Sequence, residues 1–137
     1  MRSISALRRV VALAVIVGFV AAPSIGEAQA QTATQFYVAY RAAFDKAKKV
    51  EELFPYMSKA TVAEINGTPA AERPAMFDMM KTMGTLTGLN VLSETKTADG
   101  ATLTAEGMDP DKHKVTGTIA IVKEGGAWKV GSESWKN

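Results

Sequence analysis

Residues 114–135 read KVTGTIAIVKEGGAWKVGSESW, and the rest of the predicted fold is built around this stretch. In its first half, every second residue is apolar or glycine and is expected to face the core, as in a strand with one buried face. The residues at these alternate positions are Val115, Gly117, Ile119 and Ile121. Gly125-Gly126 supplies the positive-φ positions of a tight hairpin turn. Trp128 and Val130 then share a face of the returning strand, and we expect them to meet the Ile119/Ile121 row. A hairpin alone is marginally stable, so this ribbon must pack on other elements.

The preceding residues supply those elements. Helical spacing of apolar residues predicts helices first, whereas period-two alternation predicts strands from Leu89 onward. The expected helices cover residues 34–49, 50 to about 54, 55–65 and 75–83. The expected strands cover residues 89–97 and 101–106, and the two halves of 114–135 form the last two. Thr34 is the expected first N-cap, and Thr68-Pro69 is expected to restart a helix. Helices followed by strands with short links indicate an α+β fold, with short N-terminal helices packed on a four-stranded antiparallel curved sheet.

Residues 1–30 have the pattern of a secretory signal peptide. Three arginines and no acid occupy residues 1–9, an apolar run covers 10–22, and Ala28-Gln29-Ala30 is a small-x-small cleavage signature. A helix over that apolar run would span only about 20 Å, short of the roughly 30 Å of a bilayer core. We therefore predict cleavage after Ala30, export to the periplasm or the medium, and a single domain over residues 31–137.

The composition of residues 31–137 excludes several classes of function. Thirteen Lys and Arg face thirteen Asp and Glu, and only Arg41 and Arg73 are arginines. This balance argues against a nucleic-acid partner. The absence of cysteine excludes thiol catalysis, thiolate metal sites and disulfides. We predict no cofactor, and no membrane association once the signal is removed.

Two features carry a resemblance to a known family. The stretch Lys-x-x-Gly-x-Trp-Lys-Val over residues 123–130 and the row Phe36, Tyr40, Phe44 on the first helix resemble the NTF2-like (cystatin-like) superfamily. The chain is most like its small exported bacterial members of lumazine-binding-like or unassigned function. The resemblance implies a conical apolar pocket between helices and sheet. The candidates to line or fill this pocket are Phe36, Tyr40, Phe44, Met80, Ile119 and Trp128.

The resemblance implies no activity, because the fold serves isomerases, cyclases, dehydratases and non-catalytic binders alike. A cavity enzyme of isomerase or dehydratase type needs a carboxylate held in an apolar wall beside a Tyr donor. The groups that such an enzyme would use here are Tyr37, Tyr40, Asp45, Tyr56 and Asp78. The expected inward positions of the strands are Ala101, Leu103, Ala105, Val115, Ile119, Ile121, Trp128 and Val130, without a carboxylate. The sequence therefore predicts a non-catalytic binding or interaction module, with a small cavity enzyme as the alternative.

Four methionines suggest another alternative. Met76, Met79, Met80 and Met83 recur at i, i+3, i+4 and i+7 and so share one helical face. Thioethers bind Cu(I), which makes a periplasmic copper binder a further hypothesis. The competing interpretation is a core stripe, in which methionine is an adaptable filler.

The remaining candidates concern surfaces. His113 is the only histidine and lies between two lysines, which indicates a solvated strand edge. Glu106, Asp109 and Asp111 lack the glycine turn and distal glutamate of a helix-loop-helix calcium site, so a solvated turn is expected there. Trp135 lies an odd number of residues after Trp128. Either Gly131 forms a bulge that returns Trp135 to the inner face, or Trp135 is exposed and marks a partner surface. The partners left open are a small apolar ligand, a protein, or a second copy paired through the sheet.

Overall fold

The computed structural model describes residues 31–137, so the predicted signal peptide over residues 1–30 lies outside the described residues. Within the described residues, four helices come first and four strands follow. The helices are α2 (Ala33–Lys46), the 3-10 helix η1 (Val50–Tyr56), α3 (Lys59–Gly67) and α4 (Arg73–Gly84). The strands are β1 (Thr87–Lys96), β2 (Gly100–Met108), β3 (Lys114–Glu124) and β4 (Ala127–Lys136).

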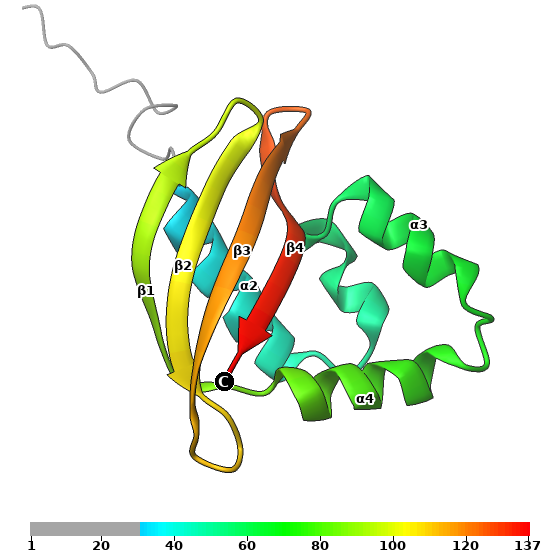
Figure 1. Cartoon of the computed structure of the whole chain (residues 1–137). Coiled ribbons are helices and arrows are strands. Elements are labelled where there is room, and N and C mark those ends of the chain that lie inside the picture. The colour runs from blue at the N-terminus through cyan, green and yellow to red at the C-terminus, as the bar shows by residue number, and fades with distance from the viewer. Residues whose placement is uncertain (1–30) are drawn as a thin grey trace, which may run out of the picture. The chain divides into compact units, whose positions relative to one another are not determined.

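The strands form one antiparallel sheet in the order β1-β2-β3-β4. Helix α2 crosses one face of this sheet, whereas α3 and α4 reach beyond the outer edge of β4 (Figure 1). The α+β prediction is confirmed. Within residues 31–137 no helix combines the length and apolar character needed to cross a membrane.

Helix α2 begins two residues earlier than predicted, because Thr32 rather than Thr34 is its N-cap. The Thr32 hydroxyl accepts a hydrogen bond from the Gln35 main-chain N–H (3.1 Å), and the Gln35 side chain accepts one from the Thr32 N–H (3.0 Å). This reciprocal capping box satisfies two N–H groups that helix geometry leaves free. Thr34 lies inside the first turn, where its N–H and hydroxyl both donate to Glu94 Oε1 of β1 at 2.7 Å.

Two helix boundaries differ from prediction. Pro55 lies inside η1 instead of starting a helix, and α3 starts at Lys59 after the N-cap Ser58. The intervening Met57 is extended and forms a parallel bridge with Val130 of β4, and this pairing holds the chain out of a helix. Thr68-Pro69 does not restart a helix either. Helix α4 begins at Arg73, and Pro74 occupies its first turn, where a missing N–H costs nothing.

The core lies between α2, η1 and the inner face of the sheet. Register places Leu103 of β2 opposite Ile119 of β3, and Ala101 opposite Ile121, with all four side chains buried. The largest fully buried side chains are Tyr37, Leu53, Leu103, Ile119, Ile121 and Val50.

Gly131 forms a bulge in β4, as one of the two alternatives predicted. Ala120 pairs with Ser132 and Ile121 pairs with Val130, so Gly131 has no partner of its own on β3. An extra residue in one strand reverses the alternation of all later side chains. Trp135 therefore lies opposite Gly117 on the inner face, where a Cβ on Gly117 would stand 2.6 Å from its ring.

The same bulge corrects the prediction of an inner face without carboxylates. Glu133 lies opposite Ile119, a residue that is fully buried on the inner face. Its side chain is 18 % exposed. The predicted inward positions ended at Val130, before the bulge, and the prediction failed because it did not follow the strand beyond Gly131.

Candidate functional site

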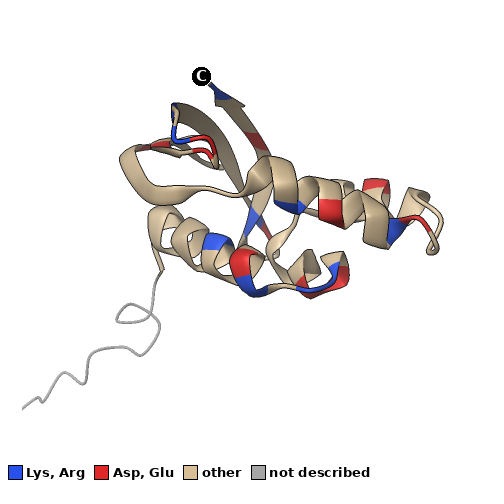
Figure 2. Cartoon of the chain, turned by 90° about the horizontal axis from the view of Figure 1, so that it is seen from below, with Lys and Arg blue, Asp and Glu red and all other residues tan. Residues whose placement is uncertain are grey.

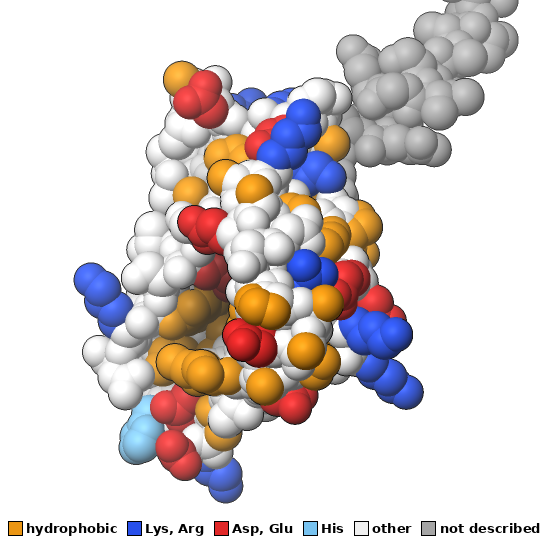
Figure 3. Space-filling view, turned by 90° about the vertical axis from the view of Figure 1, so that its right-hand side faces the viewer, with side chains coloured by type: hydrophobic (Ala, Val, Ile, Leu, Met, Phe, Trp, Pro, Cys, Tyr) orange, Lys and Arg blue, Asp and Glu red, His pale blue; other side chains and the backbone are white. Residues whose placement is uncertain are grey.

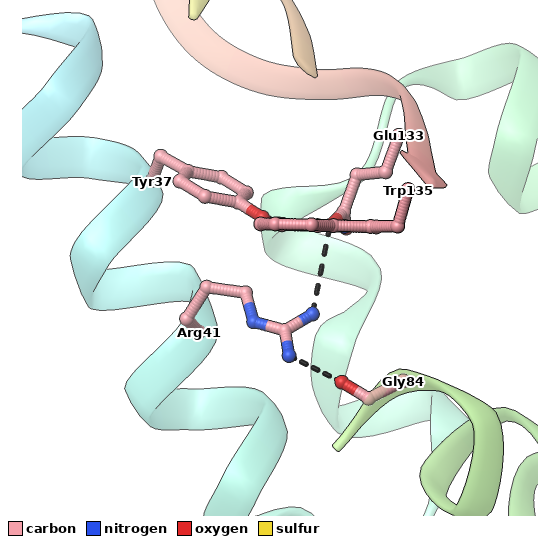
Figure 4. Close-up of polar contacts among 5 residues, drawn as sticks. All are labelled: Tyr37, Arg41, Gly84, Glu133 and Trp135. Atoms are coloured by element: carbon pink, nitrogen blue, oxygen red, sulfur yellow. Dashed lines mark hydrogen bonds and ion pairs between the residues drawn. The ribbon is translucent and has the colours of Figure 1, made fainter. Parts of the chain in front are cut away.

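A polar cluster links α2 to β4. Tyr37 and Arg41 come from α2, one helical turn apart, and Glu133 and Trp135 come from β4, two residues apart (Figure 4). Glu133 Oε2 accepts hydrogen bonds from the Tyr37 hydroxyl at 2.7 Å and from Trp135 Nε1 at 3.2 Å. Arg41 Nη1 lies 3.5 Å from the same oxygen. The contacts fix the Glu133 side chain from three directions.

Arg41 also connects this cluster to α4. Its Nη2 donates to the carbonyl oxygen of Gly84, the last residue of α4. A cation at the end of a helix binds a carbonyl oxygen that has no partner within the helix, and the negative end of the helix dipole attracts it. The guanidinium carbon also lies 4.7 Å from the centre of the Phe44 ring. Arg41, whose side chain is 8 % exposed, thereby holds α2, α4 and β4 at fixed positions around the cluster.

Burial and charge keep two tyrosines neutral. Burial raises the pKa of Tyr37 well above its ordinary value, and the negative charge of Glu133 and the hydrogen bond to it raise it further. The pKa of Tyr40 is raised for the same leading reasons, burial first and the Glu133 charge second. Both phenols are therefore hydrogen-bond donors at neutral pH. On the carboxylate, Tyr37, Trp135 and Arg41 all contact Oε2, and a hydrogen bond between Tyr40 and Glu133 further raises the pKa of Tyr40.

Three members of this cluster, Arg41, Glu133 and Trp135, form the floor of a groove of about 300 Å³. Its walls come from α2, α4 and the end of β4. We call it the methionine groove, and its lining residues are Tyr40, Arg41, Phe44, Met79, Met80, Met83, Gly84, Glu133 and Trp135. Met79 is 61 % exposed and Met83 is 79 % exposed. On the side where α3 and α4 project, apolar side chains surround a hollow next to the sheet (Figure 3).

The structure divides the six pocket candidates between three places. Tyr40, Phe44 and Met80 line the methionine groove. Phe36 and Ile119 are buried in the core. Trp128 packs at the opposite end of β4, where its indole N–H donates to the Gln31 carbonyl at 2.7 Å. Half of the predicted set thus belongs to one groove.

The other groups considered for catalysis lie outside the groove. Asp45 and Asp78 are exposed on the helices. The ring of Tyr56 packs 6.1 Å from that of Phe36 and 6.0 Å from that of Tyr40, in the aromatic layer behind the groove. Glu133, the carboxylate that does line the groove, was not among the predicted residues, although a glycine inside a strand is itself a signal for a bulge.

The four methionines do not form one cluster. Met80, Met79 and Met83 line the groove, whereas Met76 packs against the core and its sulfur accepts a hydrogen bond from the Thr68 hydroxyl at 3.7 Å. A site built from four converging thioethers is therefore not formed by these residues.

The β2–β3 loop brings Asp109, Asp111 and His113 together, with one potential ligand atom of each within 4.8 Å of the others. Asp109 accepts the His113 main-chain N–H at 2.8 Å and lies 3.4 Å from its Nδ1. That main-chain hydrogen bond is the leading cause that lowers the pKa of Asp109. Nearby, Lys114 pairs with Glu106 at 2.7 Å. These contacts account for the arrangement as a solvated turn.

Two other hollows are lined by apolar and charged residues together. One of about 470 Å³ lies between α3 and the β3–β4 turn, and its Lys129 Nζ donates to the Pro55 carbonyl at 2.5 Å. Another of about 360 Å³ lies at the start of α4, where Arg73 pairs with Glu51 at 3.6 Å. Basic and acidic positions are interspersed along the helices (Figure 2). The methionine groove alone among the three combines exposed apolar walls with a buried ionic floor.

Comparison with protein-family models, with curated proteins and with solved structures finds no match.

Proposed function

We propose that residues 31–137 form a non-catalytic binding module that holds an apolar group of its ligand in the methionine groove. The observation that carries this proposal is the coincidence of apolar walls and a fixed polar floor in one hollow of about 300 Å³. Sites for organic ligands have this composition, with mostly apolar linings and a few placed polar groups.

The exposed methionines support the proposal independently. A side chain that is 79 % exposed, like Met83, contributes little to the core, and Met79 is similar. Large apolar side chains gathered on a surface mark interaction sites more often than chance exposure. Methionine also adapts its shape to different partners, because its chain is unbranched and its sulfur is polarizable.

Membership of the NTF2-like superfamily and export to the periplasm or medium remain proposals. The arrangement of α2 against a four-stranded antiparallel sheet is compatible with the first. The signal pattern in residues 1–30 is the basis of the second.

A second candidate function is favoured by Glu133. A cavity enzyme of isomerase or dehydratase type would use the Glu133 carboxylate to take a proton and the neutral Tyr40 to donate a hydrogen bond. The ion pair with Arg41 argues for a structural carboxylate instead. Hydrogen–deuterium exchange into a carbonyl ligand, present with native protein and absent with Glu133→Gln, would support the enzyme.

Copper binding by the groove methionines is a third candidate. An unchanged melting temperature on addition of Cu(I) under reducing conditions would remove it, since a ligand that binds the folded state raises that temperature.

The binding proposal is tested with an environment-sensitive apolar dye, 1-anilinonaphthalene-8-sulfonate. We expect the dye to bind the native protein and to bind Met83→Glu at least about tenfold more weakly. The bound dye would cover the new carboxylate, and removing an unpaired charge from water costs more than about 1.4 kcal/mol. Met108→Glu is the matched control, since Met108 is exposed at 41 % and lies outside the groove. Equal weakening by both variants, or none by either, would contradict the proposal.

A further inference from the structure

The outer edge of β4 lies directly beside the methionine groove. β4 is the last strand in the sheet order, so one of its edges faces away from β3. The side chains of Glu133 and Trp135 line the groove, which places that edge and the groove together. An unpaired strand edge presents N–H and C=O groups that another strand can bind.

The pairing pattern identifies which backbone groups point outward. In antiparallel pairs, residues alternate between bonding their partner and pointing away from it. The main-chain groups of Val130 point away from β3, because its carbonyl oxygen accepts a hydrogen bond from the Ser58 N–H, which lies outside the sheet (3.1 Å). Beyond the bulge, Glu133 pairs with Ile119 and Trp135 with Gly117. Ile121, Ile119 and Gly117 are alternate residues of β3. The main-chain N–H and C=O groups of Glu133 and Trp135 therefore point away from β3, as those of Val130 do.

The chain already pairs a segment of its own with this edge. Met57 and Val130 form a parallel bridge, and Ser58 supplies the hydrogen bond. This cover ends there, because α3 starts at Lys59. Within residues 31–137, no hydrogen bond uses the main-chain N–H or C=O groups of Glu133 and Trp135 on the outward side. The edge is therefore paired at Val130 and open from Glu133 to Trp135.

The helices decide what can occupy the open part. Helices α3 and α4 reach past the β4 edge (Figure 1). In an edge-to-edge pair of two copies, related by a two-fold axis normal to the sheet, both helix layers would lie on the same side and collide. A single extended segment carries no such layer.

The geometry points to an extended peptide segment of a partner protein as the ligand. The segment adds to β4 at Glu133–Trp135, as strand addition does in other peptide-binding domains. Its alternate apolar side chains face inward onto Met79 and Met83, and the others lie beside Ser134 on the polar outer face. This inference rests on the proposed function and names the ligand class for the same groove.

The probe is the heptapeptide acetyl-Thr-Val-Thr-Leu-Thr-Val-Lys-amide, with two analogues that carry N-methyl groups either on the apolar residues or on the threonines. In an added strand only alternate N–H groups face β4. We therefore expect one analogue to bind at least about tenfold more weakly than the parent, as loss of one or two hydrogen bonds implies, and the other to bind comparably. The analogue that binds more weakly shows the direction of the added strand. Weaker binding after methylation of the apolar residues indicates an antiparallel strand, and weaker binding after methylation of the threonines indicates a parallel one.

Binding is followed by Trp fluorescence and by amide hydrogen exchange in the complete protein. The parent peptide should slow exchange of the Glu133 and Trp135 amides and leave the exposed edge of β1 unchanged. Equal affinity of both analogues, no protection at those two amides, or no binding of the parent would overturn the inference. If the dye still binds and Met83→Glu still weakens it, a small apolar molecule is the ligand and the proposed function stands. If the dye fails as well, both are refuted.

Discussion

Replacement of Glu133 tests whether the Arg41–Glu133 pair is the desolvated link between α2, α4 and β4. In Glu133→Gln the Arg41 charge loses its partner while its side chain, 8 % exposed, stays buried. Breaking a buried pair from one side costs about 3–5 kcal/mol. Arg41 keeps its hydrogen bond to the Gly84 carbonyl and its place over the Phe44 ring. We therefore expect the lower end, about 3 kcal/mol, or a melting temperature lowered by about 12 °C for a domain of this size.

A double-mutant cycle isolates the pair. Arg41→Met, Glu133→Gln and the double variant are compared by urea unfolding followed by Trp fluorescence. The double variant should lose less than the sum of the singles, by about 1.5 kcal/mol or more, because removing both charges leaves none unpaired. Glu106 and Lys114 provide the control pair, which is shorter at 2.7 Å but exposed, and should show no measurable coupling. A coupling between Arg41 and Glu133 no larger than that of the control pair would show that Arg41 and Glu133 do not form a desolvated ion pair.

Three further predictions concern single sites. Burial and the Glu133 charge raise the pKa values of Tyr37 and Tyr40, so the free energy of unfolding should be unaffected by these two groups below pH 10 and should fall above it, by up to about 2.7 kcal/mol per pH unit for the two together. Tyr37→Phe should make this fall, measured by urea unfolding above pH 10, less steep, and an unchanged slope would contradict the prediction. Gly117→Ala should cost about 1–2 kcal/mol and shift the Trp emission, because its Cβ would stand 2.6 Å from the Trp135 ring; identical emission and stability would count against the described packing. Glu94→Ala should cost about 1 kcal/mol, since it removes an anion that accepts two hydrogen bonds at the start of α2, and the loss, measured by thermal unfolding, should shrink in high salt; a salt-independent loss would argue against the helix-dipole contribution.

The periodicity of the apolar residues and the residues that favour turns were enough to predict the fold class and the order of helices and strands. Alternation in β3, the Gly125-Gly126 turn and the helical row ending at Phe44 are local signals, and the structure places them as expected. Element boundaries failed where a distant partner overrides local preference. Val130 holds Met57 and Ser58 extended, 73 and 72 residues earlier in the chain, and no local pattern contains that contact.

The candidate site was half predictable for a similar reason. Tyr40, Phe44 and Met80 follow from helical faces alone. Glu133 depends on a one-residue bulge, which reverses the face of every residue after Gly131, and the sequence permits both alternations. The ionic floor of the groove was therefore invisible until the register of β4 was known.

Native mass spectrometry of the protein isolated from its own source would show whether the methionine groove holds a ligand. We expect a bound mass that is retained under gentle ionisation by the native protein and by Met108→Glu, and is lost from Met83→Glu. A bare protein mass in all three preparations, or a bound mass that Met83→Glu keeps in full, would contradict it.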